Sequence, residues 1–73
     1  MKEFKLREGE EYIKLGQLLK AVRLAEDGSD AKFAIVGGRV TVNGEVGTMR
    51  GKKIHDGDEI AYNGEVIHVH QHT

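Results

Sequence analysis

The clearest chemistry that this sequence offers is the binding of phosphate groups by basic side chains. Between residues 32 and 53 one acidic residue, Glu45, stands against five basic residues, which gives this stretch a charge of +4; they are Lys32, Arg39, Arg50, Lys52 and Lys53. The rest of the chain has six basic and eleven acidic residues, and the net charge is −1. Because Arg and Lys bind phosphate oxygens, a fold that gathers these side chains would present an anion-binding face on a nearly neutral protein. Composition alone equally allows a fold that scatters them.

The histidines offer a second kind of chemistry, metal binding. His68, His70 and His72 alternate in the sequence, so on a continued strand they would share one face and could hold Zn²⁺ or Ni²⁺. A natural structural site usually adds Cys or a carboxylate, and the sequence fixes neither nearby. A polar tail or a cloning remnant is therefore the favoured interpretation, and no metal site is predicted. His55 is isolated and receives no assignment.

Residue types that are typical of catalytic centres do not form a catalytic pattern here. The chain has no cysteine, and its one serine, Ser29, suits the start of a helix. Gly37 and Gly38 lie too close to a predicted helix end to form a phosphate-binding loop. Asp56 and Asp58 are typical of an exposed turn. We therefore expect no catalytic residue, no cofactor and no enzyme activity.

The length of the chain predicts one small domain. A domain of 73 residues buries about 60% of the surface of its unfolded chain, which leaves no room for a deep active-site cleft. A content of 38% hydrophobic and 32% charged residues is typical of a folded domain, which we expect to span residues 1–73 with its core at about 13–69. No signal-peptide segment and no run of about 20 apolar residues is present, which predicts a cytoplasmic protein without a membrane partner. We also expect a monomer and no small-molecule substrate.

The first half of the sequence predicts a strand and two helices. Residues 4–7 alternate between apolar and charged types, as a half-buried strand does. Apolar residues then recur at helical spacing, at Leu15, Leu18, Leu19 and Val22. A second helix should begin at Asp27, which can cap free backbone N–H groups, and end at Gly37-Gly38. Its predicted buried face consists of Ala31, Ala34 and Ile35.

After residue 38 the apolar spacing becomes alternating, which predicts strands. Val40 and Val42 mark the first strand, and Asn43-Gly44 is typical of a type I′ hairpin turn because both residues tolerate positive φ. A loop at residues 47–53 and a turn at 56–58 follow. Residues 59–62 and 65–69 then form a hairpin that is joined by Asn63-Gly64. The order of elements predicts an α+β fold with two short helices packed on a small, mainly antiparallel sheet.

Taken in order, these features resemble the S-four (S4) RNA-binding domain. The family pattern Gly-x-Val-x-Val-Asn-Gly is present at residues 38–44, and its Gly-Asp-x-Ile/Val is present at residues 57–60. The resemblance covers about residues 13 to 69. The chain is most similar to the free-standing bacterial YbcJ/YaaA-like subgroup, on the strength of Leu18-Leu19-Lys20, Gly28-Ser29-Asp30-Ala31-Lys32, Val42-Asn43-Gly44-Glu45 and Arg50-Gly51-Lys52-Lys53.

The resemblance implies that RNA lies across the two helices and the hairpin that follows them. Lys14 stands where many family members have a basic residue before a leucine of the first helix. Lys32 stands where they have Arg or Lys after an alanine of the second helix. Two positions differ. Asp27-Gly28 replaces a Ser-Arg pair, which removes one phosphate contact, and Gly16 replaces an Asp, which either weakens the first helix or permits another backbone to approach closely.

The predicted function is therefore the non-catalytic binding of structured RNA, by analogy ribosomal RNA or a ribosome precursor. The predicted surface combines helix and loop residues, namely Lys14, Lys32, Arg39, Arg50, Lys52 and Lys53. Because their phosphate contacts are largely indifferent to sequence, the RNA would be recognised by shape. The aromatic residues argue against single-strand binding, since they are scattered and not interleaved with basic residues; they are Phe4, Tyr12, Phe33 and Tyr62.

Two alternative functions stay open. In the first, the chain is a protein-interaction module: Phe33 and Val36, which fall outside the predicted buried face, form a docking patch, and the basic loop meets an acidic partner. In the second, the chain is a small β-grasp protein like the sulfur carriers, as the turns at 43–45 and 56–60 suggest. Those carriers need a C-terminal Gly-Gly, and this sequence has Gln71-His72-Thr73 there. The second alternative therefore ranks below the first.

Overall fold

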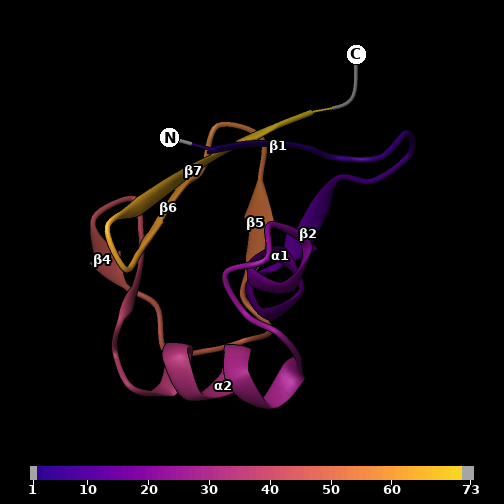
Figure 1. The fold of residues 1–73 in the computed structure, drawn as a ribbon. Coiled ribbons are helices and arrows are strands. Elements are labelled where there is room, and N and C mark those ends of the chain that lie inside the picture. Colours follow the sequence, from indigo (N-terminus) through magenta and orange to yellow (C-terminus); the bar gives the residue numbers. More distant parts are fainter. Residues whose placement is uncertain (1, 72–73) are drawn as a thin grey trace.

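In a computed structural model that describes residues 2–71, two helices pack on a five-stranded sheet and a separate two-stranded ribbon (Figure 1). The sheet has the strand order β1-β7-β6-β3-β4, with β1 Lys2–Lys5, β7 Glu65–His70, β6 Glu59–Tyr62, β3 Val40–Val42 and β4 Glu45–Val46. The other elements are the ribbon strands β2 (Tyr12–Lys14) and β5 (Lys53–His55) and the helices α1 (Leu15–Ala21) and α2 (Gly28–Val36). This architecture confirms the predicted α+β class.

The strand β1 pairs with β7 in parallel, whereas every other strand pair within residues 2–71 is antiparallel. The sequence predicts a strand at residues 4–7, and the pairing with β7 shifts it to Lys2–Lys5. Leu6 follows the strand, is buried, and donates its N–H to the carbonyl of His70 at 2.7 Å. The core therefore begins before residue 13, because a contact between the two ends of the sequence adds Leu6 to it.

Both predicted Asn-Gly turns are present and connect β3 to β4 and β6 to β7. Their φ angles are 52° and 87° at Asn43-Gly44 and 53° and 80° at Asn63-Gly64, the left-handed values that a type I′ turn requires. The side chain of Asn43 also donates to the Asp58 carboxylate at 3.0 Å and accepts the Glu59 N–H at 2.9 Å. These hydrogen bonds join the first hairpin to the start of β6 and give Asn43 a structural role.

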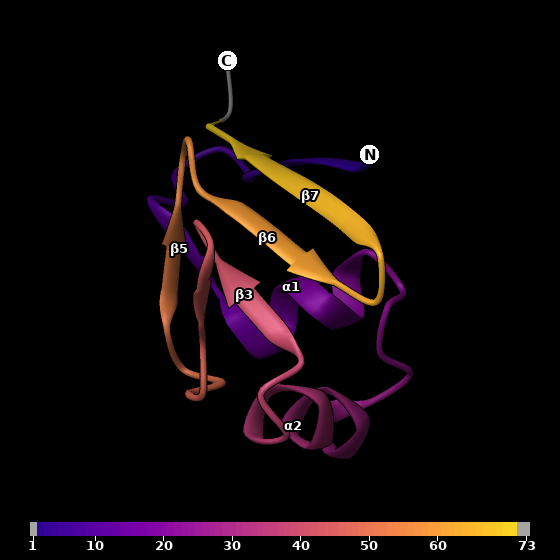
Figure 2. The ribbon, with the colours of Figure 1, turned by 90° about the vertical axis from the view of Figure 1, so that its left-hand side faces the viewer.

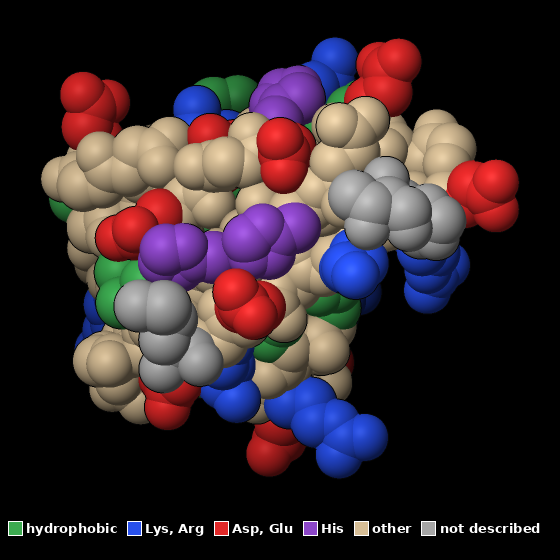
Figure 3. Space-filling model, turned by 90° about the horizontal axis from the view of Figure 1, so that it is seen from above, with side chains coloured by type: hydrophobic (Ala, Val, Ile, Leu, Met, Phe, Trp, Pro, Cys, Tyr) green, Lys and Arg blue, Asp and Glu red, His purple; other side chains and the backbone are tan. Residues whose placement is uncertain are grey.

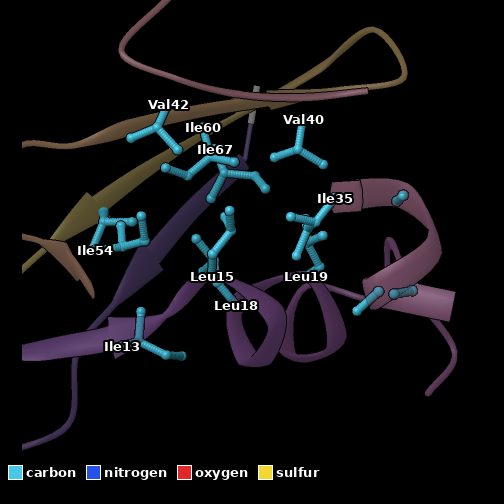
Figure 4. Packing of buried hydrophobic residues seen from close by; sticks show 14 of the residues in the cluster. Ile13, Leu15, Leu18, Leu19, Ile35, Val40, Val42, Ile54, Ile60 and Ile67 are labelled. Atoms are coloured by element: carbon cyan, nitrogen blue, oxygen red, sulfur yellow. The ribbon is translucent and has the colours of Figure 1, made fainter. Parts of the chain in front are cut away.

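The hydrophobic core lies between the sheet and the helices (Figure 4). Three leucines of α1 point toward the sheet and are fully buried, namely Leu15, Leu18 and Leu19. They meet Ile60 and Ile67 of the central strands, which are fully buried as well. The predicted apolar stripe of α1 is thus confirmed, except that the helix ends at Ala21 and Val22 serves as its C-cap. Burial of these side chains fixes α1 against the sheet.

The helix α2 begins and ends where the sequence predicts. The Asp27 carboxylate accepts the Asp30 N–H at 2.8 Å, which caps the first turn, and Gly37 is the C-cap. Its buried residues are Ala31, Ala34 and Ile35. Figures 1 and 2 show α2 at the end of the molecule opposite to β1 and β7. Within residues 2–71 neither helix is long and apolar enough to cross a membrane.

The β2–β5 ribbon is the main element that the sequence does not predict. Ile13 and Ile54 are cross-strand partners and are buried, so the residues on either side of each face outward. The loop predicted for residues 47–53 therefore ends one residue earlier, because Lys53 belongs to β5. Each strand has three residues, too few to show an alternating pattern, and β2 runs directly into α1. The outer face of the ribbon carries Tyr12, Lys14, Lys53 and His55.

Candidate functional site

The loop between β4 and β5 is bonded to the beginning of α1. Lys14 precedes the helix but its side chain does not cap it. Instead the N–H groups of Leu15 and Gly16 donate to the carbonyls of Lys52 and Arg50, at 2.9 and 3.0 Å. A Cβ atom at position 16 would lie 3.2 Å from the Arg50 Cβ, so glycine is what lets the loop come this close. Of the two consequences expected of Gly16, the close approach of another backbone is the one that the structure shows.

This contact gathers basic side chains around one hollow. Lys14, Lys20 and Arg50 line a depression of about 290 Å³ between α1, the first turn of α2 and the loop; the other lining residues are Gly16, Gln17, Gly28, Ala31 and Gly51. None of these residues is acidic. Lys14 is also the cross-strand partner of Lys53 in the ribbon. We call Lys14, Lys20, Arg50 and Lys53 the Lys14 cluster.

Among the residues that the structure describes, no carboxylate is paired with a cation of the Lys14 cluster. Throughout residues 2–71, each ion pair has a histidine as its basic member, and none has Lys or Arg. Like charges that face one another on antiparallel strands repel, so the Lys14–Lys53 pair destabilises the unliganded ribbon. Glu10 and Glu11 line a neighbouring hollow beside Lys14 and mark the limit of the basic surface. An external anion such as a phosphate would relieve the repulsion within the cluster.

Two of the predicted basic residues lie over aromatic rings. The Lys53 Nζ is 5.0 Å from the centroid of the Tyr12 ring, and the Arg39 Cζ is 5.7 Å from that of Phe33. Both distances are within the range of a cation–π interaction. Basic and aromatic residues that are scattered in the sequence are thus brought together in the fold by strand pairing and by the end of α2.

Lys32 and Arg39 belong to a second surface, on the exposed side of α2. Lys32 lines a hollow of about 350 Å³ together with Ser29, Phe33, Val36 and Gly37. Arg39 follows the helix, and its guanidinium lies over Phe33. We call Lys32, Phe33, Val36 and Arg39 the α2 patch. The structure thus separates Lys32 and Arg39 from the Lys14 cluster.

Two lysines are placed differently from the predicted RNA-binding surface: Lys52 lies outside the Lys14 cluster, and Lys20 lies within it. Lys52 stands between cluster residues in the sequence, but it lines a third hollow, which also contains Glu45. Lys20 is absent from the predicted site and lines the hollow of the Lys14 cluster. A signal for it exists in the sequence, because helical spacing puts Gln17 and Lys20 on one face, away from the apolar stripe.

His68 and His70 lie on a different face, which β1, β7 and β6 form and which Figure 3 shows from above. The His68 Nε2 is 3.2 Å from the Glu59 Oε2, and the His70 Nε2 is 3.2 Å from the Glu3 Oε1. The rings of His68 and His70 share this face, with centroids 6.5 Å apart, while His72 lies outside the described residues. Among residues 2–71, no three His, Cys, Asp or Glu side chains are grouped so as to hold a metal ion.

The acidic turn at residues 56–58 has a structural role. The Asp58 carboxylate accepts the His55 N–H at 2.7 Å as well as the Asn43 amide, and the Asp56 carboxylate accepts the Gln71 N–H at 2.8 Å. Ser29 lies in the first turn of α2, as predicted. The carboxylates of Asp56 and Asp58 are thus used in hydrogen bonds of the fold.

This chain resembles known proteins that carry the S4 domain. The model of the S4 domain matches residues 4–70. An Escherichia coli (strain K12) protein named "Putative RNA-binding protein YbcJ" is 36% identical over 58 residues, which cover 80% of this chain and 83% of that protein. A Shigella flexneri protein named "Uncharacterized protein YbcJ" matches to the same extent.

A solved structure agrees with this assignment. The solution structure of YbcJ from E. coli, described as revealing an ALFAL motif involved in RNA binding, has a TM-score of 0.73 and 34% identity to this chain. The match covers 96% of this chain and 87% of that one. It confirms the predicted fold and overturns the β-grasp alternative. By sequence and by fold, the chain belongs to the S4 domain family.

Proposed function

We propose that this protein is a non-catalytic RNA-binding protein and that the Lys14 cluster binds phosphates of a structured RNA. The observation that carries the proposal is the gathering of four cations from the ribbon, α1 and the loop without a carboxylate partner among the described residues. The family adds support, because its relative YbcJ is named as an RNA-binding protein and its structure is described by a motif involved in RNA binding.

The backbone holds the cations of the cluster in fixed relative positions. Lys14 and Lys53 are paired across the ribbon, and the backbone of Arg50 is held by the hydrogen bond that the Gly16 N–H donates to its carbonyl. Cations at fixed spacing suit the regular phosphates of a folded RNA better than those of a flexible strand. An arginine can bind two phosphate oxygens at once, while each lysine acts as a point charge. Recognition would then depend on the shape of the RNA.

The RNA target, the oligomeric state and the location of the protein are proposed as follows. We propose that the RNA is ribosomal RNA or a ribosome precursor, and that residues 1–73 act as one domain, as a monomer in the cytoplasm. In this proposal Lys32 and Arg39 contact RNA from the α2 patch, while Lys52 contributes to the positive potential from beside the cluster.

A salt titration tests RNA binding and its site together. Transcribed fragments of ribosomal RNA are titrated with the wild-type protein and with the double variant Lys14→Gln/Arg50→Gln at several salt concentrations. The logarithm of the binding constant should fall linearly with the logarithm of salt concentration, and the double variant should lower the slope by about 2. The matched control is Lys5→Gln, which removes an exposed cation of β1, outside the cluster.

The outcomes separate the parts of the proposal. Absence of binding by the wild-type protein at low salt would contradict RNA binding itself. A control variant that loses as much affinity as the double variant would contradict the assignment of the site. Equal competition by unrelated RNA stems would contradict the ribosomal target but leave RNA binding in place.

A further inference from the structure

The side chain of Phe33 on α2 is an exposed aromatic ring, whereas the residues of the hydrophobic core are buried. The side chain of Phe33 is 68% exposed, because Ala31, Ala34 and Ile35 form the face of α2 that packs on the core. Its position follows from the helical period, which turns residue 33 away from that face. The Arg39 guanidinium at 5.7 Å is the cation that lies over this ring. The ring is thus held in place and accessible to a planar ligand.

The surroundings of the Phe33 ring combine apolar and positively charged groups. The hollow beside the ring has a volume of about 350 Å³. Val36 forms an apolar wall of this hollow and Lys32 adds a positive charge, and none of its described lining residues is acidic. A nucleotide has the complementary composition, with a flat base that stacks on aromatic rings and a phosphate that pairs with Arg or Lys. The chemistry of the α2 patch therefore matches one nucleotide.

The α2 patch is continuous with the Lys14 cluster through the first turn of α2. Gly28 and Ala31 line the hollow of the cluster, while Ser29 and Lys32, each one position further along, line the hollow of the patch. An RNA strand that leaves the cluster therefore has to cross one helical turn to reach Phe33. Figure 1 shows α2 at the edge of the molecule, where such a strand would not meet the sheet.

We propose that Phe33 stacks on one unpaired base, so that the preferred ligand is an RNA stem with an unpaired nucleotide next to it. In this assignment Arg39 fixes the ring from one side and Lys32 binds the phosphate of the stacked nucleotide. The inference rests on the proposed function, because the cluster must hold the stem. It names the α2 patch as the part of the surface that distinguishes one structured RNA from another.

An extended protein surface fits the α2 patch less well than a nucleotide does. A stable protein interface buries about 800 Å² on each partner and has an apolar centre. The other large exposed apolar side chains, Val46 and Met49, line a separate hollow together with Glu45. The patch itself is one ring and one valine between two cations, which suits a small planar anion.

The test uses the full chain and two RNAs that differ by one nucleotide. The probes are a blunt RNA hairpin and the same hairpin with a single unpaired 2-aminopurine, placed at either end in separate molecules. We expect tighter binding of one extended hairpin and quenching of its 2-aminopurine fluorescence. Phe33→Ala should weaken binding of that hairpin by about fivefold to a hundredfold and abolish the quenching, while binding of the blunt hairpin changes by less than about twofold.

Two further variants separate stacking from loss of apolar surface. Phe33→Trp keeps a ring and should preserve the quenching, whereas Val36→Ala removes a similarly exposed side chain, 61% accessible, and should leave the preference intact. Because residues 33 and 36 are exposed, these changes leave the core in place. Equal binding of all hairpins without quenching, or an unchanged preference in Phe33→Ala, would overturn the inference alone. Binding of no hairpin at low salt would overturn the proposed function and the inference with it.

Discussion

The β2–β5 ribbon and the face of β1, β7 and β6 both carry charged side chains opposite one another on paired strands. In the ribbon Lys14 faces Lys53, and like charges meet. On the other face His68 lies in register between Glu59 and Glu3. A carboxylate contacts His68 and another contacts His70. The second region satisfies its polar groups within the chain. In the first region no carboxylate among residues 2–71 pairs with the facing cations, and this difference supports the anion site proposed above.

A hydrogen-bonded turn at Asp58 joins the two regions. The Asp58 carboxylate accepts the backbone N–H of His55 in β5 and the side-chain amide of Asn43 at the end of β3. This turn carries the chain from the ribbon into β6 of the sheet. The two surfaces therefore belong to one folded domain. Substitutions in one surface can nevertheless leave the other surface intact.

The largest expected effect is on RNA affinity, from charge reversal in the Lys14 cluster. The double variant Lys14→Glu/Arg50→Glu removes two charge-assisted phosphate contacts and adds repulsion, so hairpin affinity should fall by at least about a hundredfold. The matched variant His68→Gln/His70→Gln changes the other surface and should keep affinity within about twofold. Fluorescence anisotropy measures both. Equal losses in the two double variants would remove the distinction between the regions.

The second prediction concerns the backbone contact on which the cluster depends. Gly16→Val would place atoms against the Arg50 Cβ, since even a Cβ would lie 3.2 Å from it, and should lower the free energy of unfolding by about 2 kcal/mol. Gly28→Ala is the control, because nothing lies within 4 Å of its added Cβ and the helix start tolerates alanine. Urea unfolding of both variants decides. A neutral Gly16→Val would show that the loop moves freely.

The third prediction tests the turn between the regions. Asn43→Ala removes two side-chain hydrogen bonds and leaves a φ of 52° to a residue that disfavours it, so stability should fall by about 1–2 kcal/mol. Asn43→Gly tolerates the φ angle and should recover part of this loss. RNA affinity of the folded variants should equal that of the wild-type protein. A loss of affinity without a loss of stability would instead make Asn43 an RNA contact.

The smallest expected effects are changes in the stability of the free protein, and they should have opposite signs for a substitution in the ribbon and one on the β1–β7–β6 face. Lys53→Gln relieves like-charge repulsion across the ribbon and should stabilise the free protein by about 0.2–1 kcal/mol while it weakens RNA binding. Glu59→Gln removes the carboxylate that contacts His68. It should lower the free energy of unfolding of the protein by no more than about 1 kcal/mol, since the pair is exposed. Urea unfolding at low salt measures both. Destabilisation by Lys53→Gln would show that the cation–π contact with Tyr12 outweighs the repulsion.

The elements that follow from short-range rules are the ones that the sequence predicts correctly. The cap by Asp27, the buried face of α2 and both Asn-Gly turns depend on residues within a few positions of one another. Helical period and positive φ are local properties, so the amino-acid order alone determines them. The family resemblance belongs to the same category, because its motifs are these turns and helix faces in a fixed order.

The site is decided by contacts between residues that are far apart in the sequence. Lys14 meets Lys53 only because two three-residue strands pair, and neither strand is long enough to show a pattern of its own. The loop docks on Gly16, which brings Arg50 to Lys14 and Lys20 but leaves Lys52 beside Glu45. The sequence by itself thus determined the local elements, the basic residues and the family. The tertiary structure decided which cations share a surface, because strand pairing and close backbone packing act over distances that no local pattern records.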